Sequence, residues 1–366
     1  MGVKISKFEG SSVAELLYNR IIEKQITVVP LEGECFDSTL RRLVEILGDQ
    51  QIIFQIGFGS NNAYNRYIDF IVKEKGIKPP ITWVSGGTYK SDLSGIYTVA
   101  INSEACVPIQ KGEDIIGYKV TDDFAEYLYM SNILPDNTDN SRENQVVSCF
   151  ESIKAIVEKQ DMNLNNIVRT WFFNNNILEW YNSFNKIRTK IYHENNMMKK
   201  VVPASTGIGA ANPFNKELVM NLLAIKPISS FLKIREVESP LQSTAQSYGS
   251  IFSRAVEINT PLFRKMLVSG TASICKDGRT MYESDVVKQM EYTFEVIKCV
   301  LDSNGMAFQD VTRAICYFKE KDHIRLFDEH YNNKNVFIPQ IIKSNNTVCR
   351  PDLLFEIELD AVKSLD

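Results

Sequence analysis

Residues 145–173, QVVSCFESIKAIVEKQDMNLNNIVRTWFF, align without a gap on residues 289–317, QMEYTFEVIKCVLDSNGMAFQDVTRAICY. Seven of the 29 aligned positions are identical, at Gln145/Gln289, Phe150/Phe294, Glu151/Glu295, Ile153/Ile297, Lys154/Lys298, Met162/Met306 and Arg169/Arg313. Self-similarity at a fixed separation is the signature of a repeated structural unit. The chain is therefore expected to contain at least two copies of one module.

Each copy predicts a helix followed by a strand. Apolar residues recur at helical spacing in both copies, for example at Phe150, Ile153 and Val157 in the first. The segments 167–173 and 311–318 that follow are rich in β-branched and aromatic residues, as strands are. We expect a second helix after each strand, ending near Tyr192 and Tyr331, then a proline, Pro203 or Pro339, that opens a further strand pair. Segments 128–131 and 266–269 are expected to be the strands that enter the two modules.

The first part of the chain shows the same order of elements in a decayed form. Helices are predicted at 36–47 and 61–74, and strands at 51–56, 81–84 and 96–101. The predicted fold is α+β, with three tandem modules at 1–120, 121–240 and 241–366, of which the first is degenerate. Modules of this kind would bury their sheet faces against one another as a pseudo-trimer.

Composition limits the classes of function. The chain has 366 residues, 44% of them hydrophobic, and a formal net charge of -4 without basic runs, which argues against a nucleic-acid partner. The seven cysteines form no CxxC pair and are expected to be reduced thiols of a cytoplasmic protein. Three histidines without metal-ligand spacing predict no metal, and no cofactor is expected. No apolar run reaches the ~18 residues that span a bilayer, so we expect no membrane partner.

Three segments of the last third occur in an order that resembles the RidA/YjgF superfamily. They are YGSIFSRA at 248–255, LVSG at 267–270 and LLFEIE at 353–358. Five segments over most of the chain are similar to chorismatases, which contain fused units of this fold: VRTWFF at 168–173, WYNSFNKIRTKIY at 180–192, PASTGIGAANP at 203–213, SGTASI at 269–274 and CRPDLLFEIELDA at 349–361. The resemblance implies an enzyme of secondary metabolism that releases pyruvate from chorismate. The other product would be 3- or 4-hydroxybenzoate or a dihydrodiol acid.

The resemblance implies that Glu356 is the catalytic acid. Enol ether hydrolysis begins with protonation of a carbon atom, so a carboxylic acid must stay protonated near pH 7, which requires burial among apolar groups. Alternation along the strand puts Glu356 and Glu358 on one face. Both could instead lie on a solvated face. Against this, the matching segments 218–223 and 97–101 carry no acid, so the fold itself does not demand one.

Chorismate is a dianion, so cationic anchors are expected in its pocket. The resemblance places Arg254, beside Tyr248, and Arg188 of the second module there. Arg169 and Arg313 recur in both copies and are expected to form ion pairs within the fold instead.

Four further residues are candidates for the site: Cys349 in a catalytic role, and Ala272, Ser205 and Thr206 in substrate binding. Cys349 matches a position that in hydroxybenzoate-forming chorismatases directs the intermediate towards the aromatic product, with Ala272 as its counterpart across the pocket. The loop after Ile274 lacks the histidine expected there, which leaves the product open. Ser205 and Thr206 could contact the ligand, although the glycine-containing segment around them is predicted to form a tight turn at the module interface.

Two alternatives remain open. An imine or enamine deaminase of the RidA type needs an arginine shortly after a proline, and neither Pro203 nor Pro339 is followed by one. A non-catalytic binding protein with the same fold would release no pyruvate. The chain is expected to be a monomer, in which the three modules form the pseudo-trimer, or a weak homo-oligomer.

Overall fold

The computed structural model describes residues 2–18, 20–136, 141–331 and 339–365. Three units with the same order of elements follow one another along the chain. The first unit contains β1 (Gly2–Phe8), β2 (Ser11–Tyr18), β3 (Ile21–Val28), α1 (Phe36–Leu47), β4 (Gln51–Gly59), α2 (Asn61–Lys75), β5 (Ile81–Val84) and β6 (Leu93–Ile101). It has a complete set of elements, so its degeneracy lies in its sequence and not in its topology.

The second and third units repeat this order, with every predicted helix and strand present. The second contains β7 (Cys106–Lys111), β8 (Asp114–Thr121), β9 (Ala125–Ile133), α3 (Arg142–Glu158), β10 (Ile167–Asn174), α4 (Ile177–Glu194), β11 (Ala204–Gly209) and β12 (Leu218–Pro227). The third contains β13 (Lys233–Val237), β14 (Ala255–Asn259), β15 (Phe263–Ala272), α5 (Val286–Asp302), β16 (Val311–Phe318), α6 (Lys321–Tyr331), β17 (Ile341–Asn345) and β18 (Phe355–Ser364).

Each unit forms one six-stranded mixed sheet with the same strand order. The orders are β1-β2-β3-β6-β4-β5, β7-β8-β9-β12-β10-β11 and β13-β14-β15-β18-β16-β17. In each sheet the last strand of the unit lies between its third and fourth strands. The predicted α+β fold of three tandem modules is therefore confirmed.

Sheet membership moves the module boundaries towards the N-terminus. The second sheet begins with β7 at Cys106, because β7 pairs with β8 and β8 pairs with β9. The third sheet begins with β13 at Lys233, which pairs with β14. The boundaries expected at 120 and 240 therefore cut off the first strands of the second and third modules.

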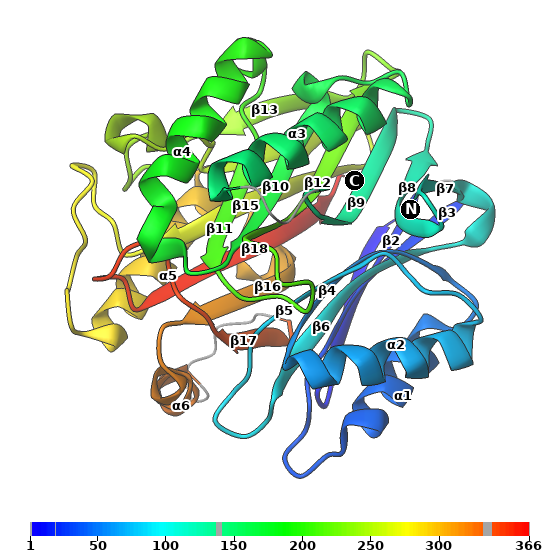
Figure 1. Cartoon of the computed structure of the whole chain (residues 1–366), viewed down its shortest axis with the longest axis horizontal. Coiled ribbons are helices and arrows are strands. Elements are labelled where there is room, and N and C mark those ends of the chain that lie inside the picture. Colours follow the sequence, from blue (N-terminus) through cyan, green and yellow to red (C-terminus); the bar gives the residue numbers. More distant parts are fainter. Residues whose placement is uncertain (1, 19, 137–140, 332–338, 366) are drawn as a thin grey trace.

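The three modules pack in a cyclic order around a common axis. β5 packs against β9, β11 against β15, and β17 against β3 and β6, so each module contacts both others through equivalent strands. The sheets face inward and the helix pairs lie on the outside (Figure 1). One apolar cluster at the axis includes Phe54, Trp171 and Leu267 from the three modules, and further clusters fill the space between each sheet and its helices.

No helix in the described part of the chain is long and apolar enough to cross a membrane.

Candidate active site

A cavity of about 990 Å³ lies between the second and third modules. Helix α4 and strand β11 form its wall on the second module, and residues from the β13–β14 connection, β15 and the start of β18 form its wall on the third. The two walls are joined by strand β11, whose Ser205 peptide N–H donates to Ser269 Oγ at 2.8 Å. The cavity is therefore a product of the module interface.

Glu356 opens onto this cavity from strand β18 and is only 4% exposed. Its neighbours in the sheet are Ala272 of β15 and Tyr317 of β16. Burial, followed by the negative charge of Glu358, raises the pKa of the Glu356 carboxyl to about 8, while Arg169 acts weakly in the opposite direction. A carboxylic acid in this position is mostly protonated at neutral pH.

Gly270 makes room for the Glu356 carboxyl. A Cβ atom at position 270 would lie 2.0 Å from Glu356 Oε1, which is far closer than two unbonded atoms can approach. Gly270 itself lines the cavity. The glycine of the SGTASI segment is thus the residue that lets an acid occupy this point of the interface.

The equivalent positions in the other two sheets carry no acid. In the third sheet Glu356 lies opposite Tyr317, which is four residues after the β-bulge at Arg313. The corresponding pairs are Phe173 with Val219 in the second sheet and Phe58 with Gly95 in the first. The sequence-based observation that the other modules lack this acid is therefore confirmed at the level of register.

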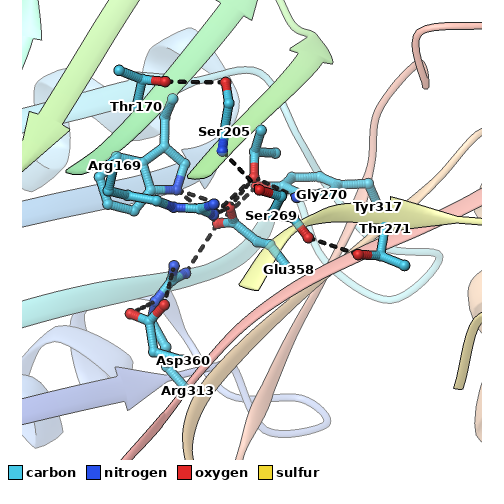
Figure 2. Close-up of polar contacts among 12 residues, drawn as sticks. Arg169, Thr170, Ser205, Ser269, Gly270, Thr271, Arg313, Tyr317, Glu358 and Asp360 are labelled. Atoms are coloured by element: carbon cyan, nitrogen blue, oxygen red, sulfur yellow. Dashed lines mark hydrogen bonds and ion pairs between the residues drawn. The ribbon is translucent and has the colours of Figure 1, made fainter. Parts of the chain in front are cut away.

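Glu358, two residues further along the same face of β18, has the opposite environment (Figure 2). Its carboxylate accepts hydrogen bonds from Trp171 Nε1 at 2.8 Å and from Arg313 Nη1 at 3.0 Å. Further donors are Arg169, the Thr206 hydroxyl and the Tyr317 hydroxyl. Although burial acts to raise it, the pKa of Glu358 is held below its ordinary value by Arg313, Arg169 and these hydrogen bonds.

The buried charges that surround Glu358 balance without Glu356. Arg169 and Arg313 are the two cations, Glu358 and Asp360 are the two anions, and Arg313 Nε donates to Asp360 at 2.7 Å. The expected ion-pairing role of Arg169 and Arg313 is confirmed by these contacts. Since a buried charge needs a partner, a third carboxylate on this face is favoured in its neutral form. The alternative of a solvated face for both glutamates is wrong.

Arg188 reaches the cavity from helix α4 and is 2% exposed. Its guanidinium donates to Asn185 Oδ1 at 2.7 Å and lies near Ser205 Oγ and Ser250 Oγ at 3.4 and 3.5 Å. These partners are uncharged, and the guanidinium also lies over the rings of Phe172 and Phe184. A buried cation without a carboxylate among these contacts is well suited to bind an anionic ligand.

Arg254 lines the opposite wall of the cavity. Its Nε and Nη2 atoms donate to the Ser243 carbonyl at 2.9 and 2.7 Å, and its guanidinium lies over the Phe252 ring. Lys186 and Arg350 also line the cavity, which therefore has more basic than acidic side chains. Such a lining favours an anion.

Cys349 and Ala272 lie together at the cavity wall, next to Ile274 and Leu353 in one small apolar cluster. Desolvation, followed by the nearby Glu356 carboxyl, raises the pKa of the Cys349 thiol to about 12. The thiol is therefore neutral near pH 7 and is not a thiolate nucleophile there.

The structure separates Ser205 from Thr206. Both lie on strand β11 and not in a tight turn as predicted, because residues 204–209 pair in parallel with β10. Ser205 lines the cavity, whereas Thr206 points to the other face of the strand and bonds to Glu358. Thr206 therefore does not line this cavity, and its ligand contact stays a prediction. Tyr248 ends a short 3-10 helix, and its side chain lies outside the described residues.

Tyr181, Asn185 and Ser250 are among the cavity residues that were not predicted from the sequence. Tyr181 Oη lies 3.3 Å from Ser250 Oγ, and burial raises the pKa of Tyr181 above its ordinary value. Tyr181, Asn185 and Arg188 are spaced i, i+4, i+7, which is the spacing of one helix face. That spacing around the predicted Arg188 could have identified the other two.

Among the described residues, the equivalent interface between the third and first modules has a different lining, which includes the acidic side chains Glu32 and Asp328. Its cavity, of about 260 Å³, is lined by Gly10, Pro30 and Lys343 among others. Gly10 directly precedes β2 as Arg254 precedes β14, and Gly95 occupies the position of Glu356.

Within the described residues, no group of three or more His, Cys, Asp or Glu side chains could hold a metal ion.

No family model matches the sequence, and no curated protein matches it. The structure is similar to a crystal structure of a chorismatase at 1.08 Å resolution, with a TM-score of 0.64 and 18% identity over 86% of this chain and 94% of that one. Two shorter proteins also align with part of the chain. Yeast Mmf1 aligns with a TM-score of 0.27 and 23% identity over 33% of this chain and 94% of that one. YyfA of the Rid family from Yersinia pestis aligns with a TM-score of 0.31 and 20% identity over 35% of this chain and 98% of that one. The chain thus has the three-module fold of the chorismatase structure, with a buried acid and two buried arginines around one interface cavity.

Proposed function

We propose that the chain is a chorismatase that uses Glu356 as its general acid. The observation that supports this most strongly is a buried carboxyl group, with a pKa of about 8, that opens onto a cavity lined by Arg188 and Arg254. An acid of this pKa is protonated at neutral pH and is strong enough to transfer its proton in a transition state. The basic lining fits a dicarboxylate.

The chemistry follows from the protonation state of the acid. Glu356 gives its proton to the terminal methylene carbon of the enol ether, and the electron pair of the double bond forms the new C–H bond. The resulting oxocarbenium carbon is attacked by water, and the hemiketal then collapses into pyruvate and the dihydrodiol acid. A hydroxybenzoate forms when this ring loses one water molecule, as one hydroxyl leaves and a ring carbon gives up its proton. The Glu356 carboxylate recovers a proton from the attacking water. The low-dielectric site that raises the pKa also favours this proton transfer to a carbon atom.

Cys349 and Ala272 are proposed to shape the part of the cavity that receives the ring. A neutral thiol beside the acid can contact the ring intermediate without attacking it. We expect 3- or 4-hydroxybenzoate as the second product, and recovery of a dihydrodiol acid would remove this role from Cys349.

Release of pyruvate from chorismate tests the proposal. The wild-type protein is incubated with chorismate, pyruvate is measured with lactate dehydrogenase and NADH, and the ring product is identified by chromatography. Stoichiometric pyruvate and ring product would support the proposal. Binding of chorismate without pyruvate would instead indicate a binding protein with the same fold.

Replacement of Arg188 by methionine is expected to raise KM for chorismate by about 10- to 100-fold, because a hydrogen bond to a charged group contributes about 1.5–3 kcal/mol. Steady-state kinetics at neutral pH would measure this change. Lys190 lies on the same helix and its side chain is 73% exposed, so Lys190→Met is a matched control expected to keep the wild-type KM. An unchanged KM in Arg188→Met would show that the substrate carboxylate binds elsewhere.

A further inference from the structure

The Thr206 hydroxyl connects the acid's surroundings to the buried ion pairs. It accepts hydrogen bonds from Arg169 Nη2 at 2.8 Å and from the Gly270 peptide N–H at 3.0 Å, and it donates to the Glu358 carboxylate. A hydroxyl group has one hydrogen and two acceptor positions. All three are used, and the side chain is 1% exposed, so its orientation is fixed.

Both donors to Thr206 lie close to the Glu356 carboxyl. Gly270 lies directly beside it, since a Cβ at that residue would be 2.0 Å from Glu356 Oε1. Arg169 is near enough for its charge to act on Glu356. Moreover, Arg169 Nε and Nη1 are buried without an acceptor among the described residues, so this guanidinium has unused donors.

An N–H donor that lost Thr206 as its acceptor and bonded to Glu356 instead would stabilise the carboxylate form of the acid. We infer that Thr206 is a positioning residue that holds the Gly270 N–H and the Arg169 guanidinium on its own hydroxyl and on Glu358, so that Glu356 keeps its proton. This inference rests on the proposed function of Glu356 as a general acid. Thr206 touches no substrate in this account and acts through the acid.

The other charged or titratable groups around Glu356 do not replace the positioning role of Thr206. On its own strand Glu358 acts against ionisation, and Tyr317 on β16 and Cys349 before β18 are neutral groups whose pKa values are raised. The cations of the cavity wall are Arg188, Arg254, Lys186 and Arg350. The wild-type protein and the variants below all contain these cations, so their effect on Glu356 is the same in each protein that is compared.

The interface between the first and second modules offers a matched control. Thr82 of β5 is fully buried, donates to Asn221 Oδ1 and accepts the Asn132 peptide N–H at 2.6 Å. Asn221 lies opposite Trp171 in β10, as Glu358 lies opposite Ile315 in β16, so the two threonines have equivalent roles in their interfaces. No acid corresponds to Glu356 there, because Val219 takes its place.

The test compares Thr206→Val, Thr206→Ser and Thr82→Val. Valine keeps the shape of threonine but removes the hydroxyl. For Thr206→Val we expect the alkaline limb of kcat to move to lower pH by about one unit or more, with kcat at pH 8 reduced about fivefold or more and KM changed little. Thr206→Ser is expected to restore both properties, and Thr82→Val to leave both at their wild-type values.

Several results would overturn the inference. The first is an alkaline limb of kcat that does not move in Thr206→Val. The second is an increase in KM alone, which would indicate substrate contact. The third is a Thr206→Ser variant that is as impaired as the valine variant.

An infrared titration tests the protonation of Glu356 without turnover. The band of the protonated Glu356 carboxyl is identified by its absence in Glu356→Gln, and at pH 7 it should weaken in Thr206→Val and persist in Thr82→Val. If the wild-type protein releases no pyruvate, the proposed function fails, yet this titration still tests the positioning role.

Discussion

Glu356→Gln is expected to lower kcat for pyruvate release by about 10²- to 10⁴-fold, the usual contribution of a positioned general acid. Glutamine has nearly the same shape and fits the space beside Gly270, but it has no acidic proton to give. Coupled kinetics at neutral pH, with enzyme in excess where turnover is slow, would measure the loss. A variant that kept more than about a tenth of the wild-type rate, a barrier change below ~1.4 kcal/mol, would show that another group is the acid.

The same substitution is expected to stabilise the fold at neutral pH. The pKa of Glu356 is about 8 in the folded state and 4.5 in its ordinary state, so the folded state binds the extra proton between these values. Stability contributed by this group is complete below pH 4.5 and is lost as the pH rises towards about 8. At pH 7 this lowers the free energy of unfolding by roughly 3 kcal/mol relative to its value below pH 4.5. Glutamine removes it, so urea unfolding should show a more stable variant at pH 7, and a less stable one would contradict the burial of a neutral acid.

Glu358→Gln is expected to destabilise the protein by about 3–5 kcal/mol, because it leaves two buried arginines with too few anions. Arg169 would lose its carboxylate partner, and Arg313 would keep only Asp360. Urea unfolding at pH 7 would measure this loss, with Glu356→Gln as the matched control two residues away on the same strand. A loss of less than ~1 kcal/mol would show that the central ion pairs are dispensable.

The repeat made most of the architecture predictable. Every helix and strand expected from Phe36 onward is present, because each apolar pattern in one module is repeated in another. No element was predicted at residues 2–28, where β1, β2 and β3 form the start of the first sheet, nor at β7, β8, β13 and β14. The boundaries expected at 120 and 240 left β7 and β13 in the preceding modules. β7 is an edge strand that contains Pro108, and a proline weakens the strand pattern even where an edge tolerates it.

The acid was predictable in type but not in detail. Alternation placed Glu356 and Glu358 on one face, but the pattern of a single strand cannot say which of them is ionised. The difference arises from donors far away in the sequence, at Arg169, Trp171 and Thr206, that reach only Glu358. The position of Thr206 was missed for a related reason. A strand turns adjacent residues to opposite faces, so Ser205 meets the cavity and Thr206 meets the core.

The pH dependence of pyruvate release from chorismate by the wild-type protein tests the central claim most directly. If a neutral Glu356 is the proton donor, kcat/KM is expected to be highest on the acid side of about pH 8 and to fall tenfold per unit above it, as the acid ionises. A rate that instead rose with pH through the range of an ordinary carboxyl group, or a complete lack of pyruvate at every pH, would contradict the account.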